Sequence, residues 1–473
     1  MQTDRQKDTA NQMEIAAIII LIACLAIALG FEFVNGFHDT ANAVATVIYT
    51  RSMKPTHAVI WSGFVNFLGV LFVLGAGAGV AFKIVGLLPT DLQVNAHGPL
   101  GIWAILSILI VAVLWNLATW YVGLPASSSH TLVGSIAGVG LTWAYLAGKE
   151  YNTEKLFDTL KGLALAPLLG FGLAATIFIL FKVISKRPEF FKEPPKGDTP
   201  PPWWIRLMLI GTCTGVSWFH GSNDGQKGIG LVMLILIALV PGQYTVNPAF
   251  DAAKIEKTLV LIESGRDVLA KPAFEGNKKA EEAAERLEKV DHILEETKSL
   301  TALPHVEQET LRVEILKAAS AIKKAAKDED ASADDKKVLA ETEKGIKGAV
   351  EFVALWVIVA VALALGIGTM VGWKRIVVTV GEKIGKAHLT YAQGAAAELT
   401  AMITIATADY MAAPVSTTHI LSSGIAGTMA ANKSGLQGKT VRNILIAWVL
   451  TLPVTIVLSG LLFWATAGKY IVK

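Results

Sequence analysis

Long apolar runs alternate with short polar segments along most of this chain of 473 residues. A helix needs roughly 20 apolar residues to cross a bilayer, and runs of that size lie near 56–82, 101–121, 160–181, 351–373, 390–411 and 441–466. Two longer runs, 15–50 and 205–241, each hold a polar, glycine-containing patch, at 35–42 and 220–227. The pattern predicts an all-α polytopic membrane protein in which both long runs are broken helices.

Two shorter segments, about 125–147 and 414–431, begin with related motifs. Pro-Ala-Ser-Ser-Ser-His ends at His130 and Pro-Val-Ser-Thr-Thr-His ends at His419, and Ile-Ala-Gly follows each at the same distance. This correspondence predicts an internal duplication, with one copy at 15–181 and the other divided between 205–242 and 351–466. Each copy is expected to hold about five transmembrane segments, including a Pro-Ser hairpin that either crosses or re-enters the membrane.

The charged residues separate a soluble insertion from the membrane copies. Of the 42 basic and 39 acidic residues, 18 and 22 respectively lie within 243–350. Ala, Glu and Lys dominate that segment, and Leu287, Val290 and Leu294 recur at helical spacing, which predicts a helical soluble insertion. It is interpreted as a cap or spacer rather than a ligand-sensing unit, for which no motif is present. A tail at 1–14, a linker at 182–204 and a tail at 467–473 complete the predicted organisation.

Short basic segments predict the orientation in the membrane, because Lys and Arg collect on the cytoplasmic side. They lie at 51–54, 182–206, 374–386 and 433–442. Five crossings per copy put all four on one side and give the second copy the inverted topology. The insertion and both termini would then lie on the periplasmic or extracellular side of the cytoplasmic (inner) membrane.

Composition excludes several other classes of protein. A hydrophobic content of 53% is too high for one soluble domain, and a net charge of +3 gives no reason to expect a nucleic-acid partner. The two cysteines, Cys24 and Cys213, both lie in apolar runs, so neither a disulfide framework nor a zinc cluster is expected.

Ionisable groups inside apolar runs are the first candidates for function, because each is costly in a bilayer. Asp39 and Asp224 occupy equivalent places in the two polar patches. Either could cap the half-helix that follows it, but a carboxylate beside amides and unwound carbonyl groups suits a Na⁺ or H⁺ site better. Lys227 aligns with Asn42 and could contact an anion or form a purely structural ion pair. Glu398 is another carboxylate in an apolar helix.

Six weaker candidates have ordinary alternatives as helix-end, interhelical or satisfied core residues: Glu32, Asn35, His38, Asn116, His130 and His419. The paired Pro-Ser motifs suit an anion, because a proline in the first turn is followed by free N–H groups and hydroxyl donors. Close helix packing by small residues is the alternative for either motif alone. The hydroxyl donors belong to Ser127, Ser128, Ser129, Ser416, Thr417 and Thr418.

The polar patches, the paired motifs and a run from Leu363 to Met370 resemble the inorganic phosphate transporter (PiT) family, in particular its bacterial low-affinity phosphate permeases. The resemblance implies import of inorganic phosphate by secondary transport, coupled to Na⁺ in some members and to H⁺ in others. It places phosphate beside the two motifs and supports Glu398. It also assigns four residues to the substrate and ion site: Asp39, Asn42, Asn223 and Asp224.

The chain departs from the family signature Gly-Ala-Asn-Asp-Val-Ala-Asn-Ala at two positions. His38 and Lys227 stand where amides are usual, and both changes remove an oxygen that could coordinate Na⁺. Proton coupling is therefore predicted, with Na⁺ coupling as the alternative. A neutral divalent metal–phosphate complex is a further hypothesis for the substrate. No cofactor is expected beyond the transported ions. The sequence does not decide between a monomer and a homodimer.

Two other classes of protein and one other substrate are alternatives to a phosphate transporter. An intramembrane hydrolase using Ser127 to Ser129 with His130 is disfavoured, because adjacent residues on a helix do not face each other. A receptor, the second class, would use the insertion to bind a ligand. We do not expect the protein to be an enzyme. Sulfate or another oxyanion is the rival substrate, but fully ionised sulfate lacks the P–OH donor that Asp39 or Asp224 could accept from phosphate.

Overall fold

The computed structural model describes residues 2–94, 99–195, 197 and 199–471, and these ranges contain helices and no β-strand. The chain divides into two compact units. The first comprises Met1–Pro89, Ile102–Val232 and Ala354–Lys473, and the second comprises Thr90–Gly101 and Met233–Val353. The second unit therefore contains the segment predicted as an insertion, 243–350, together with pieces of both predicted membrane copies.

Helices of the first unit are listed here in chain order, and two of them, α7 and α10, have one end in the second unit: α1 (Gln2–Asp39), α2 (Ala41–Tyr49), α3 (Pro55–Leu71), α4 (Val73–Ala76), α5 (Gly79–Val85), α7 (Pro99–Tyr121), α8 (Ser128–Ala147), α9 (Thr153–Ile184), η1 (Pro188–Phe191), α10 (Trp203–Leu239), α16 (Leu355–Met370), α17 (Lys374–Glu382), α18 (Tyr391–Tyr410), α19 (Thr417–Ala431), α20 (Gly438–Ala467) and η4 (Gly468–Tyr470). Helix α1 thus begins within the predicted tail at 1–14. The end of the predicted tail at 467–473 lies outside the described residues.

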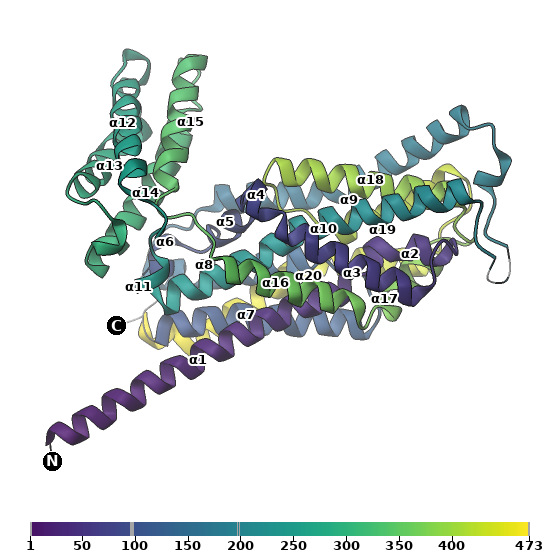
Figure 1. Cartoon of the computed structure of the whole chain (residues 1–473), viewed down its shortest axis with the longest axis horizontal. Helices are drawn as coiled ribbons and strands as arrows, with labels where there is room; N and C mark the ends of the chain where they lie inside the picture. The colour runs from purple at the N-terminus through teal and green to yellow at the C-terminus, as the bar shows by residue number, and fades with distance from the viewer. Residues whose placement is uncertain (1, 95–98, 196, 198, 472–473) are drawn as a thin grey trace. The chain divides into compact units, whose positions relative to one another are not determined.

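The remaining described helices belong to the second unit: α6 (Thr90–Val94), α11 (Pro241–Tyr244), α12 (Ala252–Leu269), η2 (Pro272–Phe274), α13 (Lys278–Glu295), η3 (Leu300–Ala302), α14 (His305–Ala325) and α15 (Ala333–Lys347). Helix α13 packs on α14, and α12 packs on α15 (Figure 1). The apolar residues predicted to share one helix face, Leu287, Val290 and Leu294, are completely buried in the core of this unit.

One buried arginine connects the two ends of the insertion by hydrogen bonds. Arg312 on α14 is 2% exposed and donates to the carbonyl oxygens of Thr245, at 3.2 Å, and Val350, at 2.8 Å. Burial lowers the pKa of its guanidinium to about 10. The two carbonyl groups offset part of the cost of burying this charge.

The two predicted broken helices have different outcomes. Between α1 and α2 the helix is interrupted only at Thr40, inside the predicted patch. The second prediction is wrong, because α10 runs unbroken from Trp203 to Leu239. Its polar side chains pair with groups of other helices, so the backbone does not have to unwind to satisfy them. At Gly221 an added Cβ would lie 2.2 Å from the carbonyl oxygen of Asn66, so glycine there permits close helix packing.

Helix pairs of the first unit join segments that are far apart in the sequence. Helix α8 packs on α20 and α19 packs on α9, while α16 packs against both α1 and α3 (Figure 1). Each of the first two pairs joins a helix of one predicted copy to a helix of the other, and the two pairs are equivalent in the predicted alignment of the copies. The duplication and the inverted topology of its copies stay predictions.

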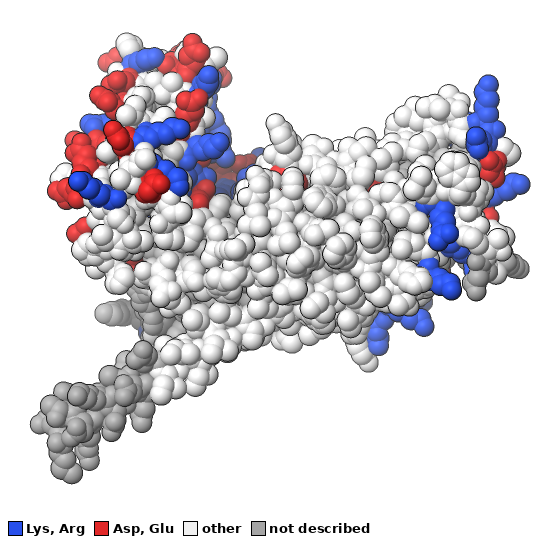
Figure 2. Space-filling view, viewed as in Figure 1, with Lys and Arg blue, Asp and Glu red and all other residues white. Residues whose placement is uncertain are grey.

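Within the described residues, five spans are long and apolar enough to cross a membrane: α1 from Ile15 with α2, α3 with α4, α7, α9 and α20 with η4. A sixth span is obtained if α16 and α17, bent by 63° at their junction, are counted together. Figure 2 shows the surface of the first unit as largely free of charged side chains in this view, whereas the second unit carries many of both signs. These features are those of a multi-pass membrane protein with a charged helical unit.

Candidate functional site

The two Pro-Ser motifs end at the N-termini of α8 and α19 and have nearly the same backbone geometry. Ser127 and Ser416 are the capping residues, both extended, with φ of −98° and −97°. Each side-chain oxygen accepts the N–H of the histidine three residues later, His130 or His419, at 3.2 Å. The duplicated motif therefore builds two matching helix starts.

Asp39 lies between these two helix N-termini. Its carboxylate accepts hydrogen bonds from the hydroxyl of Ser128, at 3.1 Å, and from that of Thr418, at 2.9 Å. The amide of Asn42 donates to Thr417, at 3.2 Å, and to Thr418, at 3.0 Å. The structure thus brings together residues of the first polar patch with hydroxyl groups of both motifs.

Lys227 connects the second polar patch to the same place. Its Nζ donates to Asp224 Oδ1 and to Ser129 Oγ, both at 2.6 Å, and to the carbonyl oxygen of Val415 at 2.9 Å. Ser129 Oγ in turn donates to the Val415 carbonyl at 2.9 Å. The lysine is only 2% exposed. Lys227 forms the buried ion pair that was one of its two predicted roles, and it also contacts both Pro-Ser motifs.

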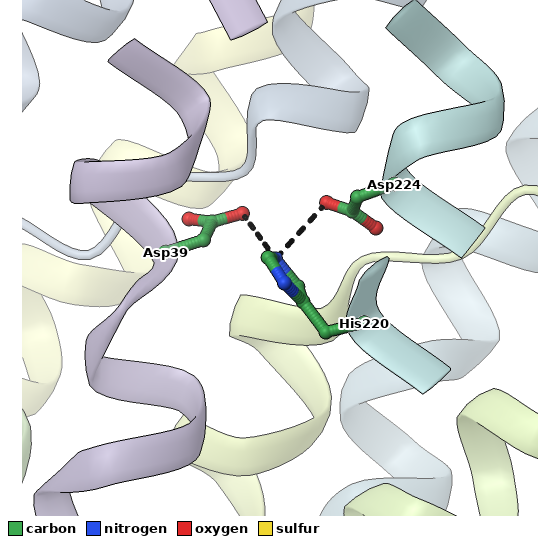
Figure 3. Close-up of side chains that lie close together, drawn as sticks. All are labelled: Asp39, His220 and Asp224. Atoms are coloured by element: carbon green, nitrogen blue, oxygen red, sulfur yellow. Dashed lines mark ion pairs between the residues drawn. The ribbon is translucent and has the colours of Figure 1, made fainter. Parts of the chain in front are cut away.

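His220 is a site residue that sequence reasoning missed. Its Nε2 lies 4.0 Å from Asp39 Oδ2 and 3.5 Å from Asp224 Oδ2, between the two carboxylates (Figure 3). Ligand atoms of these three buried residues all lie within 4.8 Å of one another. Its spacing could have revealed it, since His220 lies one helical turn before Asp224 on the same face of an apolar helix. The cluster could hold a proton or a metal ion.

The hydrogen bonds around His220 determine its tautomer. Thr369 Oγ1 donates to the Leu365 carbonyl at 2.8 Å, so it accepts the bond of 2.9 Å from Asn66 Nδ2. The oxygen of Asn66 is then the atom 3.1 Å from His220 Nδ1, which must carry a hydrogen. Neutral His220 would therefore turn the lone pair of Nε2 toward two carboxylates. A proton or a cation at Nε2 removes that repulsion.

His38 and three residues of the second patch have partners outside their own helices. His38 bonds through Nδ1 to Asp39, at 2.9 Å, and through Nε2 to Thr119, at 3.2 Å. Asn223 donates to the Ala413 carbonyl at 3.2 Å. Asp409 on α18 was not among the predicted site residues. It accepts hydrogen bonds from Ser222, at 2.5 Å, and from Gln226, at 2.8 Å.

Glu398 and Asn116 are not joined to this cluster by hydrogen bonds within the described residues. Glu398 accepts the hydroxyl of Thr212, and its Oε1 has no hydrogen-bond partner in the described part of the chain. The side-chain amide of Asn116 also lacks a partner there. Both are completely buried. Their predicted roles are therefore untested by the contacts.

Glu32 and Asn35 interact with each other, through a hydrogen bond of 3.4 Å. Glu32 also lies against α10, since a Cβ added at Gly228, next to Lys227, would be 2.3 Å from its Cδ. His130 and His419 lie behind the helix N-termini. Their ring centroids are 4.6 Å apart, and His419 also stacks on Trp448 at 4.1 Å.

The expectation that the motif serines do not face His130 is wrong for Ser127. Ser127 and His130 do meet, with 2.8 Å between Oγ and Nδ1, because residues three apart share a helix face. Ser127 Oγ is also the acceptor of the cap at α8, so its contacts are those of a capping residue.

Comparisons with known proteins support a transporter. The family model described as the phosphate transporter family matches residues 35–459. The low-affinity inorganic phosphate transporters PitA and PitB of Escherichia coli (strain K12) are both 41% identical; 94% of this chain and 96% of PitA align, and 96% and 97% for PitB. A probable low-affinity inorganic phosphate transporter of Bacillus subtilis (strain 168) is 28% identical over 94% of this chain and 97% of its own length.

A solved structure described as the sodium-dependent phosphate transporter is similar to this fold. The TM-score is 0.54 at 20% identity, over 94% of this chain and 98% of that one. The relatives are named transporters and not enzymes. The resemblance found in the polar patches and paired motifs is confirmed, and the chain belongs to the phosphate transporter family.

Proposed function

We propose that this protein is a secondary active transporter that imports inorganic phosphate across the cytoplasmic membrane by proton symport and alternating access. The observation that carries the proposal is the convergence of two capped helix N-termini, α8 and α19, on two buried carboxylates and one lysine. Family membership and the names of the E. coli relatives support phosphate as the substrate. The insertion would lie on the outer side of the membrane.

The helix N-termini supply donors for a tetrahedral anion. First-turn N–H groups and hydroxyl side chains bind phosphate without adding fixed charge. The hydroxyls of Ser128 and Thr418 donate to Asp39 in this structure. In the proposed cycle, phosphate takes over these donors, and its own P–OH donates to the Asp39 carboxylate. Fully ionised sulfate has no such hydrogen, so it would give Asp39 no donor in place of these two hydroxyls.

The charge of the cluster explains why phosphate would not enter alone. Lys227 offsets one of the two aspartates, Asp39 and Asp224, so the cluster keeps one negative charge while His220 is neutral. A phosphate dianion would meet repulsion in a region of low dielectric. A proton bound at His220 Nε2, between the two carboxylates, would make the cluster neutral. Proton and phosphate binding would therefore favour each other.

A divalent metal carried with phosphate would serve the same purpose. Two carboxylates and the imidazole of His220 lie close enough to ligate one ion. This mixed set suits Mn²⁺ or Zn²⁺ better than Mg²⁺, which prefers oxygen ligands alone. If a neutral metal–phosphate complex is the substrate, uptake stops when a chelator removes divalent ions. Full uptake in chelator would reject this form of the substrate.

Sodium coupling is the second candidate, and one observation favours it. The side-chain oxygens of Asn42 and Asn223 are buried without hydrogen-bond partners within the described part of the chain. Such amide oxygens are ligands that Na⁺ accepts. Lys227 argues against Na⁺ beside Asp224, because its ammonium group already lies 2.6 Å from Oδ1.

The test is uptake of labelled phosphate into proteoliposomes with an imposed pH gradient or an imposed Na⁺ gradient, with sulfate and arsenate as competitors. The Ser128→Ala variant is expected to lose most uptake. Ser135→Ala is its matched control, since Ser135 is buried in the same helix and donates only to the Thr131 carbonyl. Asp39→Asn and Asp224→Asn are expected to abolish coupled uptake. Full activity in both aspartate variants would reject the site.

A further inference from the structure

A cavity of about 660 Å³ lies in the first unit where the end of α7 meets α17, and neither Asp39 nor Asp224 is among the described residues that line it. Its lining includes three aromatic side chains and three cations: Trp120, Tyr121, Trp373, Lys374, Arg375 and Lys383. No Asp or Glu is among the described residues that line it. The cavity therefore favours an anion.

The walls of this cavity are held in place by hydrogen bonds between α7, the loop that follows it, and α17. Trp120 Nε1 donates to the Gly372 carbonyl at 2.9 Å, and Thr379 donates to the Gly123 carbonyl at 2.8 Å. Arg375 donates to the Tyr121 carbonyl at 2.6 Å, and its guanidinium lies over the Tyr121 ring, 4.9 Å from the centroid. The cavity is thus a built feature of the fold.

Lys374 and Lys383 differ from Arg375 in their contacts. All three cations are exposed at the cavity, but the arginine is also held by the carbonyl oxygen and the aromatic rings. Figure 2 shows Lys and Arg side chains projecting where Figure 1 labels α17. The two ammonium groups are able to reach an anion that occupies the cavity, while Arg375 fixes the shape of its wall.

Exposed apolar residues lead from the cavity along two helices. On α7, Leu114 is 60% exposed and lies two turns from Tyr121 on the same face. On α16 and the residue that follows it, Leu363, Ile367 and Val371 recur every four residues and are 47%, 51% and 48% exposed. Both stripes end beside the cavity lining. A free anion would use the cations alone, but a phospholipid would also use these stripes for its acyl chains.

We propose that this cavity binds the headgroup of an anionic phospholipid from the leaflet on the side of the basic loops. The headgroup phosphate lies beside Lys374 and Lys383, and the acyl chains run along the exposed faces of α7 and α16. Tyr and Trp at the cavity mouth are typical of the membrane–water interface. Basic pockets between transmembrane helices are suited to acidic lipid headgroups. The lipid would join α7 of the first copy to α17 of the second.

The full chain, purified in an uncharged detergent, would be mixed with phosphatidylglycerol, with phosphatidylcholine, or with inorganic phosphate alone. Native mass spectrometry counts bound lipid, and thermal unfolding reports stabilisation. Lys374→Gln with Lys383→Gln removes two of the three exposed cations and leaves Arg375 in place. Lys439→Gln with Arg442→Gln is the matched control, because both are exposed on α20 and neither lines the cavity.

Phosphatidylglycerol is expected to bind in preference to phosphatidylcholine and to raise the unfolding temperature. At low ionic strength the Lys374 and Lys383 double variant should bind it roughly thirtyfold more weakly, from about 1 kcal/mol for each cation. The control pair should bind as the native chain does. Equal retention of both lipids, or unchanged binding in the double variant, would overturn the proposal. It would also be overturned if inorganic phosphate alone gave the same stabilisation and the double variant lost it.

Discussion

Replacing Lys227 with methionine should destabilise the protein far more than removing a lysine from an ordinary surface pair. Lys227 is 2% exposed, and its ammonium group donates to Asp224, Ser129 and the Val415 carbonyl. Methionine fills similar space but leaves the Asp224 carboxylate buried without its counter-charge. Breaking a buried pair by removing one partner costs about 3–5 kcal/mol. The thermal unfolding temperature of the purified protein should fall accordingly.

Asp158 and Lys161 form a matched control with the same three-residue spacing on a helix. Their side chains are 59% and 79% exposed, and the Lys161 Nζ to Asp158 Oδ1 distance is 3.4 Å. Such surface pairs contribute about 0.2–1 kcal/mol, so Lys161→Met should leave the unfolding temperature almost unchanged. Both variants would be compared in one detergent by a scan of intrinsic fluorescence at a single heating rate.

Adding Asp224→Asn to Lys227→Met separates charge from packing. The asparagine removes the unpaired charge, so the double variant should recover most of the stability that the single variant loses, a coupling of at least about 2 kcal/mol. Phosphate uptake should stay absent, since both groups belong to the proposed ion path. The reasoning is refuted if Lys227→Met unfolds at the native temperature, or if the two substitutions destabilise additively.

Two further predictions concern packing in the membrane unit and the stability of the second unit. Gly221→Ala should destabilise the protein by about 1–3 kcal/mol, because its Cβ would lie 2.2 Å from the backbone oxygen of Asn66. The control is Gly211→Ala on the same helix, whose Cβ meets no atom within 4 Å and which should stabilise the protein slightly. Equal unfolding temperatures of the two variants would contradict this. Hydrogen bonds from Lys271 and Ser332 lower the pKa of Asp335. A depressed folded-state pKa gives stability that is present above about pH 4, the ordinary aspartate range, and is lost as pH falls through the folded-state pKa. Hydrogen exchange of α15 in the full chain, corrected for intrinsic rates, should therefore speed up at low pH, and Asp335→Asn should flatten that dependence; an unchanged slope would count against it.

Much of the fold could be predicted because lipid exposure makes the hydrophobic signal strong. Helices α7, α9 and α20 contain the apolar runs predicted at 101–121, 160–181 and 441–466. The continuity of α10 could not be predicted in the same way. A polar patch in an apolar run looks like a break until its partners are known, and its partners, such as Asn66 and Asp409, come from other helices.

The candidate site was predicted in part, for a related reason. Ionisable residues in apolar segments are costly, and this rule identified Asp39, Asp224 and Lys227, which the structure brings together with the motif hydroxyls. His220 was missed because it lies in the patch predicted to be unwound, where helical spacing to Asp224 would not apply. Only the three-dimensional arrangement shows that its free nitrogen faces two carboxylates.

The measurement that tests the central claim most directly is proton entry during phosphate uptake. Proteoliposomes holding a pH-sensitive dye would receive phosphate in Na⁺-free buffer, with labelled phosphate counted in parallel. The account predicts that the lumen acidifies as phosphate enters, and that Asp224→Asn abolishes both signals. Phosphate entry that requires Na⁺ and leaves the luminal pH unchanged would contradict proton coupling, and no phosphate entry under any imposed gradient would contradict the proposed function itself.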